Sequence, residues 1–300
     1  MKSSYLKLPP GELAARAQKA VALLGDCNVC AQECRVNRLA GELGICRGGR
    51  LAAVSSSGPH FGEEYVLVGT GGSGTIFFAY CNLRCEFCQN FEISQLGEGD
   101  EVSAGELAVM MLELQQRGCH NINLVSPSHF VPQFLEALAV AAEKGLTLPV
   151  VYNTGGYDSP ETLDLLDGIV DIYMPDIKFA DDDAGRKYSG AAAYFTVARR
   201  AVKKMHAQVG DLDLDVRGIA YRGLLVRHLV MPGNLARSEK IFEFLAEEVS
   251  KATLVNIMDQ YYPAFNAHKY TELGRRITRK EYQAAIDAAR RAGLSRIYPD

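Results

Sequence analysis

Three cysteines on one short segment of the chain have the residue type and spacing to hold a metal cofactor. Cys81, Cys85 and Cys88, the cysteine triplet, form a Cys-x3-Cys-x2-Cys run directly after a strand-like apolar stretch at residues 75–80. Three thiolates can bind three irons of a four-iron, four-sulfur cluster and leave the fourth iron open to a ligand, beside which Phe87 would place an aromatic face. The alternatives are a zinc knuckle or three unrelated buried thiols, but zinc sites usually have four ligands and Cys-x2-Cys pairs. The spacing therefore favours an iron–sulfur cluster with one open coordination position.

A second group of cysteines, the four-cysteine set, lies upstream, with arginines between its members: Cys27, Cys30, Cys34 and Cys46, with Arg35, Arg38 and Arg47. The spacing is Cys-x2-Cys-x3-Cys-x11-Cys, in a section too rich in loops to be stabilised by packing alone. Four thiolates this close in sequence predict a closed metal site. Such a set suits zinc and also suits a four-iron cluster, so the sequence leaves the metal open and favours a structural role over a catalytic one.

The composition is that of a globular enzyme and gives no sign of a nucleic-acid or membrane partner. The chain has 300 residues, of which 48% are hydrophobic and 23% charged, and its formal net charge of −4 provides no basic footprint for nucleic acid. The first residues lack the apolar core of a signal peptide, and no stretch approaches the ~20 apolar residues of a membrane span. The cysteines are grouped at metal-ligand spacings and are not spread as a disulfide framework, so we expect a cytoplasmic protein.

Stretches with strand character alternate with stretches with helix character over most of the chain. The expected strands are at residues 75–80, 121–126, 148–153, 170–176, 223–230 and 253–258. The expected helices are at residues 12–24, 193–208 and 235–250, and after Ser103 (with Glu106), Ser159 (with Pro160) and Thr278 (with Glu281). This alternation predicts parallel βα units, and six of them make a partial (βα)6 TIM-like barrel. In such barrels the functional loops follow the carboxyl ends of the strands, which is where the cysteine triplet lies.

The two cysteine groups belong to two predicted parts of the chain. Residues 1–66 form a small N-terminal four-cysteine metal-binding section that ends in a loop-rich stretch at residues 55–60. Residues 67–300 form the barrel domain, whose first strand follows a glycine-rich run at residues 69–74. We therefore expect an α/β protein made of a barrel and one small appendage.

The segment GSGTIFFAYCNLRCEFCQN, residues 72–90, resembles the signature of the radical S-adenosylmethionine superfamily, in the branch of the pyruvate formate-lyase activating enzyme. Weaker similarity covers residues 59–270. The stretch PHFGEE at residues 59–64, together with the upstream cysteines, is similar to a less characterised activase-like subgroup. The resemblance implies a [4Fe–4S] cluster on the cysteine triplet and S-adenosylmethionine on its open iron.

The resemblance also implies a cation site at the ends of two barrel strands. Activases hold a small, monovalent cation beside the carboxylate of S-adenosylmethionine, and the corresponding positions here are Asn153 with Thr154, and Met174 with Asp176. Asn153 stands where the activases have an aspartate, which removes one negative charge, and the motif around Asp176 adds Lys178. An aspartate at a strand end of an α/β protein is also polar by default, which is the alternative for Asp176.

Further residues are implied at the amino acid end of S-adenosylmethionine. Ser126, Ser128 and His129 stand where the superfamily often has a Gly-Gly-Glu motif for the amino group, and hydroxyls or an imidazole can accept that hydrogen bond. Arg227 matches a strand position near the carboxylate, where a guanidinium is a natural partner; a structural ion pair is the alternative. Two more candidates for cofactor or substrate contact are Asn256 and Gln260. No side chain is assigned as a catalytic acid, base or nucleophile.

The resemblance implies a radical enzyme and leaves three functions open. Reduced flavodoxin or ferredoxin would deliver one electron, and cleavage of S-adenosylmethionine would give a 5′-deoxyadenosyl radical that abstracts hydrogen. The first function is activation of a partner glycyl-radical enzyme, the second is modification of a small molecule or peptide, and the third is non-catalytic electron transfer. The open iron disfavours the third function. Classical activases lack the four-cysteine set, which argues that the partner or substrate differs from theirs.

Overall fold

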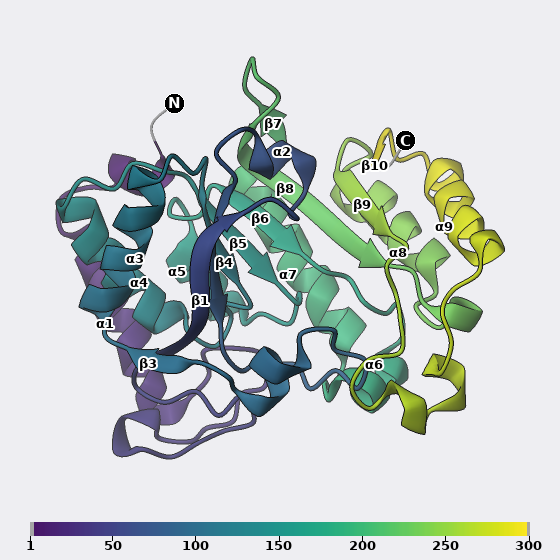
Figure 1. Cartoon of the computed structure of the whole chain (residues 1–300), viewed down its shortest axis with the longest axis horizontal. Coiled ribbons are helices and arrows are strands. Elements are labelled where there is room, and N and C mark those ends of the chain that lie inside the picture. The colour runs from purple at the N-terminus through teal and green to yellow at the C-terminus, as the bar shows by residue number, and fades with distance from the viewer. Residues whose placement is uncertain (1–2, 299–300) are drawn as a thin grey trace.

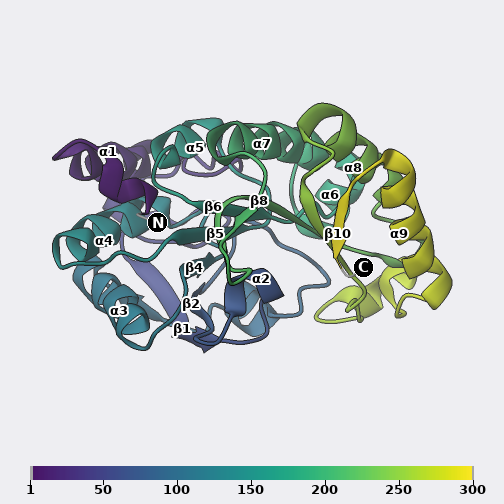
Figure 2. The same cartoon turned by 90° about the horizontal axis from the view of Figure 1, so that it is seen from above.

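The computed structural model describes residues 3–298, in which a curved, open sheet is surrounded on its outer side by the long helices (Figures 1 and 2). The strands are β1 (Ala52–His60), β2 (Ser73–Phe78), β3 (Asp100–Val102), β4 (Ile122–Val125), β5 (Val150–Thr154), β6 (Ile172–Pro175), β7 (Asp213–Leu214), β8 (Ala220–Leu229), β9 (Leu254–Met258) and β10 (Arg296–Tyr298). Their order is β10-β9-β8-β6-β5-β4-β2-β1-β3, and β7 pairs with β8. Strands β2, β4, β5, β6, β8, β9 and β10 are parallel, whereas β1 is antiparallel to β2 and to β3.

The six predicted strands are present as β2, β4, β5, β6, β8 and β9, which confirms the α/β class and the partial barrel. Strand β10 adds one more parallel strand beyond β9, and β1 and β3 extend the sheet beyond β2. In the described part of the chain the sheet ends at β3 and at β10 without closing.

Strand β1 includes the stretch at residues 55–60 that the sequence analysis expected to be a loop. Its backbone pairs with β2, from Ser57 opposite Ile76 to His60 opposite Ser73. Strand β3 pairs only with residues 52–54, so Ser56 and Ser57 lie on an exposed part of the strand. An exposed strand can have a serine-rich sequence, which is why this segment was expected to be a loop. Strand β1 therefore precedes residue 66 and yet belongs to the sheet, while a domain boundary at residue 66 stays a prediction.

The long helices lie along the outer face of the sheet, and those from α3 onward lie between strands in the chain, whereas α1 precedes the first strand (Figure 2). They are α1 (Glu12–Ala22), α2 (Tyr65–Val68), α3 (Ala104–Gln116), α4 (Val131–Glu143), α5 (Pro160–Leu166), α6 (Asp182–Ser189), α7 (Tyr194–Val209), α8 (Ser238–Phe244) and α9 (Arg279–Ala292). Short α2 is the exception, since it lies at the open side of the sheet, where Tyr65 packs on Tyr298 of β10 with ring centroids 4.8 Å apart. Within residues 3–298 no helix combines the length and apolar character needed to cross a membrane.

Two predicted helix starts have the expected capping box. Ser103 caps α3 with Glu106, and Thr278 caps α9 with Glu281, each pair exchanging side-chain and backbone hydrogen bonds. The predicted helix at 235–250 begins later, as α8, and continues into a π-helical turn at Leu245–Val249. The local sequence signals thus fix most helix starts.

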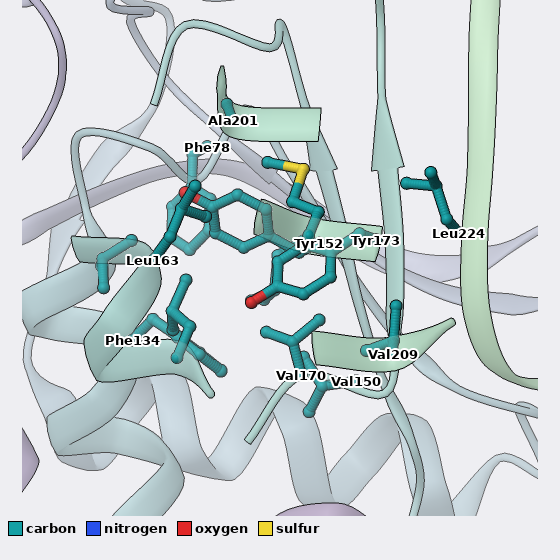
Figure 3. Close-up of a cluster of buried hydrophobic side chains, with 14 of the residues drawn as sticks. Phe78, Phe134, Val150, Tyr152, Leu163, Val170, Tyr173, Ala201, Val209 and Leu224 are labelled. Carbon is teal, nitrogen blue, oxygen red and sulfur yellow. The ribbon is translucent and has the colours of Figure 1, made fainter. Parts of the chain in front are cut away.

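Alternate residues of the parallel strands face the helices and the inside of the barrel. Tyr152 on β5 and Tyr173 on β6 are fully buried against side chains of α4, α5 and α7, with ring centroids 5.8 Å apart (Figure 3). The inner face carries a second apolar cluster that includes Val66, Leu67, Val151, Ile172, Met174 and Leu225. Since side chains alternate along a strand, Asn153 and Arg227, two residues beyond members of this cluster, also face inward, nearer the carboxyl ends.

Candidate active site

A pocket opens at the carboxyl ends of the parallel strands, next to the loop that follows β2. Its empty space, including the part open to solvent, is about 1030 Å³. The polar lining includes Cys81, Cys85, Cys88, Ser126, Asn153, Thr154, Asp176, Lys178 and Arg227. The apolar lining includes Leu83, Phe87, Leu229 and Met258. This is the end of a barrel at which functional loops gather, so the fold and the cysteine triplet agree on the location.

The cysteine triplet fits a [4Fe–4S] cluster with one open iron. Cys81 Sγ accepts a backbone hydrogen bond at 3.4 Å, and the sulfurs of Cys85 and Cys88 lie 3.1 and 3.0 Å from the hydroxyls of Ser189 and Ser94. Burial raises the pKa of Cys81 to about 11 and of Cys85 to about 12, so bound metal is what would make them thiolates near neutral pH. Among residues 3–298 no further cysteine lines this pocket, which leaves the fourth iron to a ligand.

Charged side chains at the strand ends form a network around Asp176. Arg227 Nε donates to Asp176 Oδ1 at 2.8 Å, and its Nη2 donates to Asn153 Oδ1 at 2.7 Å. Lys178 Nζ donates to Asp176 Oδ2 at 2.5 Å. Burial raises the pKa of Asp176, but Arg227 and Lys178 outweigh it and hold that pKa below its usual value. The network thus places two cations, Arg227 and Lys178, at the wall of the pocket that contains the cysteine triplet, and such cations are natural partners of a ligand carboxylate.

Two glutamates that sequence reasoning did not assign to the site approach this network from inside the barrel. Glu63 and Glu64 precede α2, and their side chains are only 7% and 6% exposed. Glu64 Oε1 lies 3.8 Å from Arg227 Nη1 and accepts a hydrogen bond at 3.1 Å from Asn256, which lies outside the pocket lining. Burial raises the pKa of Glu63. The available signal was the pair of acids directly before the apolar sequence of α2.

The structure brings most of the predicted cofactor residues to this pocket, namely Phe87, Ser126, Asn153, Asp176 and Arg227, and also Gln260. Ser128 is not in the lining, and its hydroxyl lies 2.9 Å from Thr154 Oγ1. His129 is also outside, with Nε2 at 3.2 Å from the carbonyl oxygen of Ala79, and burial lowers its pKa to about 3, so its imidazole is neutral. Contact of each of these residues with S-adenosylmethionine stays a prediction.

The oxygens that the sequence analysis assigned to a cation already have protein partners. Asn153 Oδ1 is bonded to Arg227, and Asp176 is bonded to Arg227 and Lys178. Met174 is fully buried in the inner apolar cluster. A cation at these oxygens would have to displace Lys178 or Arg227, and its presence is untested.

The four-cysteine set is gathered around a second, smaller pocket. Cys27, Cys30, Cys34 and Cys46 line it together with Arg38 and other residues. Burial raises the pKa of Cys30 and of Cys46. In the described part of the chain, no group of three or more His, Cys, Asp or Glu side chains lies close enough to share a single metal ion.

Residues 75–245, more than half of the chain, match the Radical SAM superfamily, and the chain belongs to this superfamily. Its members use a [4Fe–4S] cluster and S-adenosylmethionine, which is the pair that the cysteine triplet and its pocket fit.

The chain is similar to two curated proteins in sequence and to one solved structure in fold. It is 32% identical over 302 residues to an uncharacterized protein of Methanocaldococcus jannaschii, covering 98% of this chain and 82% of that protein. It is 23% identical over 231 residues to the pyruvate formate-lyase-activating enzyme of Clostridium pasteurianum, covering 75% and 87%. The structure of SuiB of Streptococcus suis bound to S-adenosylmethionine aligns with a TM-score of 0.49 and 12% identity over 73% of this chain and 47% of SuiB, so the chain spans less than half of that structure.

Proposed function

We propose that this chain binds S-adenosylmethionine in the pocket at the cysteine triplet and splits it reductively, and that the resulting 5′-deoxyadenosyl radical takes a hydrogen atom from a substrate. The observation that carries the proposal is one pocket that contains both the cysteine triplet and the network of Asp176, Lys178 and Arg227. The [4Fe–4S] cluster supplies the single electron that breaks the sulfonium–carbon bond. A reduced flavodoxin or ferredoxin loses that electron, and the products are methionine, 5′-deoxyadenosine and a substrate radical.

The protein's own side chains bind and orient S-adenosylmethionine. Arg227 and Lys178 attract its carboxylate, and Ser126 accepts a hydrogen bond from its amino group. Phe87, together with the apolar lining, excludes water from the reacting end of the ligand. A separate monovalent cation is not needed in this arrangement, because Lys178 already places a positive charge at Asp176.

For the substrate we propose a glycine of a partner glycyl-radical enzyme in the cytoplasm. The similarity to the pyruvate formate-lyase-activating enzyme of Clostridium pasteurianum supports an activase. The four-cysteine set, which classical activases lack, supports a partner other than theirs. Radical modification of a small molecule or peptide is the second candidate.

Cleavage of S-adenosylmethionine is tested on anaerobically reconstituted protein with dithionite as reductant. The protein should release 5′-deoxyadenosine, and a variant with Cys81, Cys85 and Cys88 all changed to Ala should release none. Cys119→Ala is the matched control, because Cys119 is a buried cysteine outside both pockets. Protein with a full cluster that forms no 5′-deoxyadenosine under strong reduction would refute the radical function.

The substrate is tested with a glycyl-radical enzyme encoded beside this gene. An activase should generate a glycyl radical, seen by electron paramagnetic resonance, and should move deuterium from the glycine α-carbon into 5′-deoxyadenosine. Deuterium transfer from a small molecule or peptide, without a glycyl radical, would support the second candidate instead.

A further inference from the structure

Backbone and side-chain donors point at the sulfurs of the four-cysteine set. The Ile45 N–H donates to Cys34 Sγ at 3.4 Å, and the Gly48 N–H donates to Cys46 Sγ at 3.4 Å. Arg38 Nη1 lies 3.9 Å from Cys27 Sγ. A neutral thiol is a weak acceptor, whereas a thiolate is a strong one, so donors directed at several sulfurs of one pocket favour thiolates there.

Arg38 provides an independent observation, because it is a buried cation without a carboxylate partner. It is 1% exposed, and its guanidinium donates to the carbonyl oxygens of Gly49 and His129, each at 2.8 Å. No carboxylate within residues 3–298 forms an ion pair with it; besides the two carbonyls, its guanidinium lies over the Phe130 ring, 5.7 Å from the centroid, and next to Cys27 Sγ. An unpaired buried charge is costly, so an anionic group is expected in the pocket that Arg38 lines.

Close contacts show that the backbone is fitted around these groups. A Cβ on Gly44 would lie 2.8 Å from Cys34 Sγ, and a Cβ on Gly48 would lie 2.8 Å from Arg38 Nη2. Glycine is therefore required at both positions for the sulfur and the guanidinium to stay where they are. This degree of fit is expected of a built site and not of four incidental thiols.

We propose that the four-cysteine set binds a second [4Fe–4S] cluster, in which all four irons are held by protein thiolates. Four thiolates also suit a zinc ion, but zinc undergoes no redox change, whereas a reduced cluster carries an additional negative charge that a cation without a carboxylate partner can balance. The buried guanidinium of Arg38, 3.9 Å from Cys27 Sγ, therefore favours the cluster over zinc.

The proposed cluster site is attached to the loops that form the active-site end of the barrel. Gln32 Nε2 donates to the carbonyl oxygen of Asn82, within the loop of the cysteine triplet, at 2.8 Å. Cys30 forms a β-bridge with Asp158, just beyond the end of β5. The two cysteine groups are thus neighbours in the fold, and the second cluster is a one-electron centre beside the first.

Metal analysis of the variant that lacks Cys81, Cys85 and Cys88 tests the proposal, because only the second site remains in that protein and S-adenosylmethionine cleavage is not required. After anaerobic reconstitution it should contain about four irons and four sulfides per chain, against about eight of each in the unaltered protein. About one zinc per chain, or no metal, would overturn the proposal. The added change Cys46→Ser should remove that iron, whereas adding Cys119→Ala should leave it in place.

The reduction potential of the cluster gives a second test, measured for Arg38→Met in the variant that lacks Cys81, Cys85 and Cys88. Loss of the cation should make the cluster harder to reduce and shift its reduction potential to a more negative value, because reduction adds negative charge. Arg38→Lys should restore part of the shift. A retained cluster whose potential is unchanged in Arg38→Met would overturn its placement beside Arg38.

Discussion

The two cysteine groups of this chain differ in how many thiols they supply and in how much open space lies beside them. The cysteine triplet supplies three thiols at the wall of a pocket of about 1030 Å³ that is open to solvent and contains charged side chains. The four-cysteine set supplies four thiols around about 270 Å³ beside the buried Arg38. An incomplete set of ligands with room beside it admits a reacting molecule, whereas a complete set without room does not. Under the proposed function, access, and not cysteine chemistry as such, would make the cysteine triplet the reacting site and the four-cysteine set the closed one.

The largest effect is expected from removing one thiol of the cysteine triplet. Cys85→Ala should abolish 5′-deoxyadenosine formation, because a cluster held by two cysteines is lost or disordered. Iron should fall by about four per chain while the other cluster stays. Formation of 5′-deoxyadenosine at an undiminished rate would remove the functional difference between the two groups.

The charged wall of the open pocket should account for the next largest effect. Arg227→Ala should weaken S-adenosylmethionine binding by about ten- to a thousand-fold, because a buried charged contact is worth a few kcal/mol when one partner is removed. Equilibrium binding to the reconstituted protein measures it, with iron content as a check on folding. Arg222→Ala is the control, since Arg222 lies on the same strand but bonds to Ser4 and Gln208 at its opposite end. Unchanged affinity in Arg227→Ala would make Arg227 part of the scaffold.

Removing one thiol of the four-cysteine set should mainly lower the stability of the surrounding residues 25–50. Cys27→Ala or Cys46→Ala should make residues 25–50 sensitive to proteolysis, because metal binding organises a loop-rich section. The iron bound by the cysteine triplet should remain at about four per chain. Resistance to protease equal to that of the unaltered protein would show that packing alone holds this section.

A smaller effect is expected for Asp176→Asn, which should weaken S-adenosylmethionine binding by less than about tenfold, since Arg227 and Lys178 both remain. The pKa of Asp176 is below its usual value, so its ion pairs stabilise the fold above the unfolded pKa of about 4 and are lost as the pH falls through the folded pKa. The difference in free energy of unfolding between the variant and the unaltered protein should therefore be constant from pH 6 to 9. A difference that changes within this range would assign the titration to another group.

The smallest effect should come from Glu64→Gln. Glu64 Oε1 is 3.8 Å from Arg227 Nη1, too far for a direct hydrogen bond, and glutamine can still accept the bond from Asn256. We expect S-adenosylmethionine affinity to change by less than about threefold. A loss as large as that in Arg227→Ala would mean that Glu64 sets the position of the guanidinium.

The strands and helix starts were predictable because their signals are local. Apolar runs mark β2, β4, β5, β6, β8 and β9, and the capping boxes at Ser103 and Thr278 mark two helices. The cysteine triplet was found for the same reason, as its ligands lie on one loop. Strand β1 was missed because its stability comes from pairing with β2, and its serine-rich sequence has no apolar alternation to show this.

Asp176 and Arg227 were predicted at the first site from sequence, but the contacts of Arg38 and Glu64 could not be predicted, because they depend on residues far apart in sequence. Arg38 was one of three arginines near the four-cysteine set, and only the folded chain shows that it is the buried one. Glu64 meets Arg227 only because α2 lies at the open side of the sheet. Spacing along the chain carries no information about such contacts.

The anchoring of the N-terminal residues has a consequence for biogenesis. Residues 3–50 are synthesised well before their partners: Arg38 bonds to His129, 91 positions on, Val29 to Thr162, 133 positions on, and Ser4 to Arg222, 218 positions on. Contacts of such long sequence separation form late in folding. The four-cysteine set therefore remains reduced and without its final neighbours until most of the barrel has been translated. Oxygen or a competing metal has its best access to the chain during that interval on the ribosome.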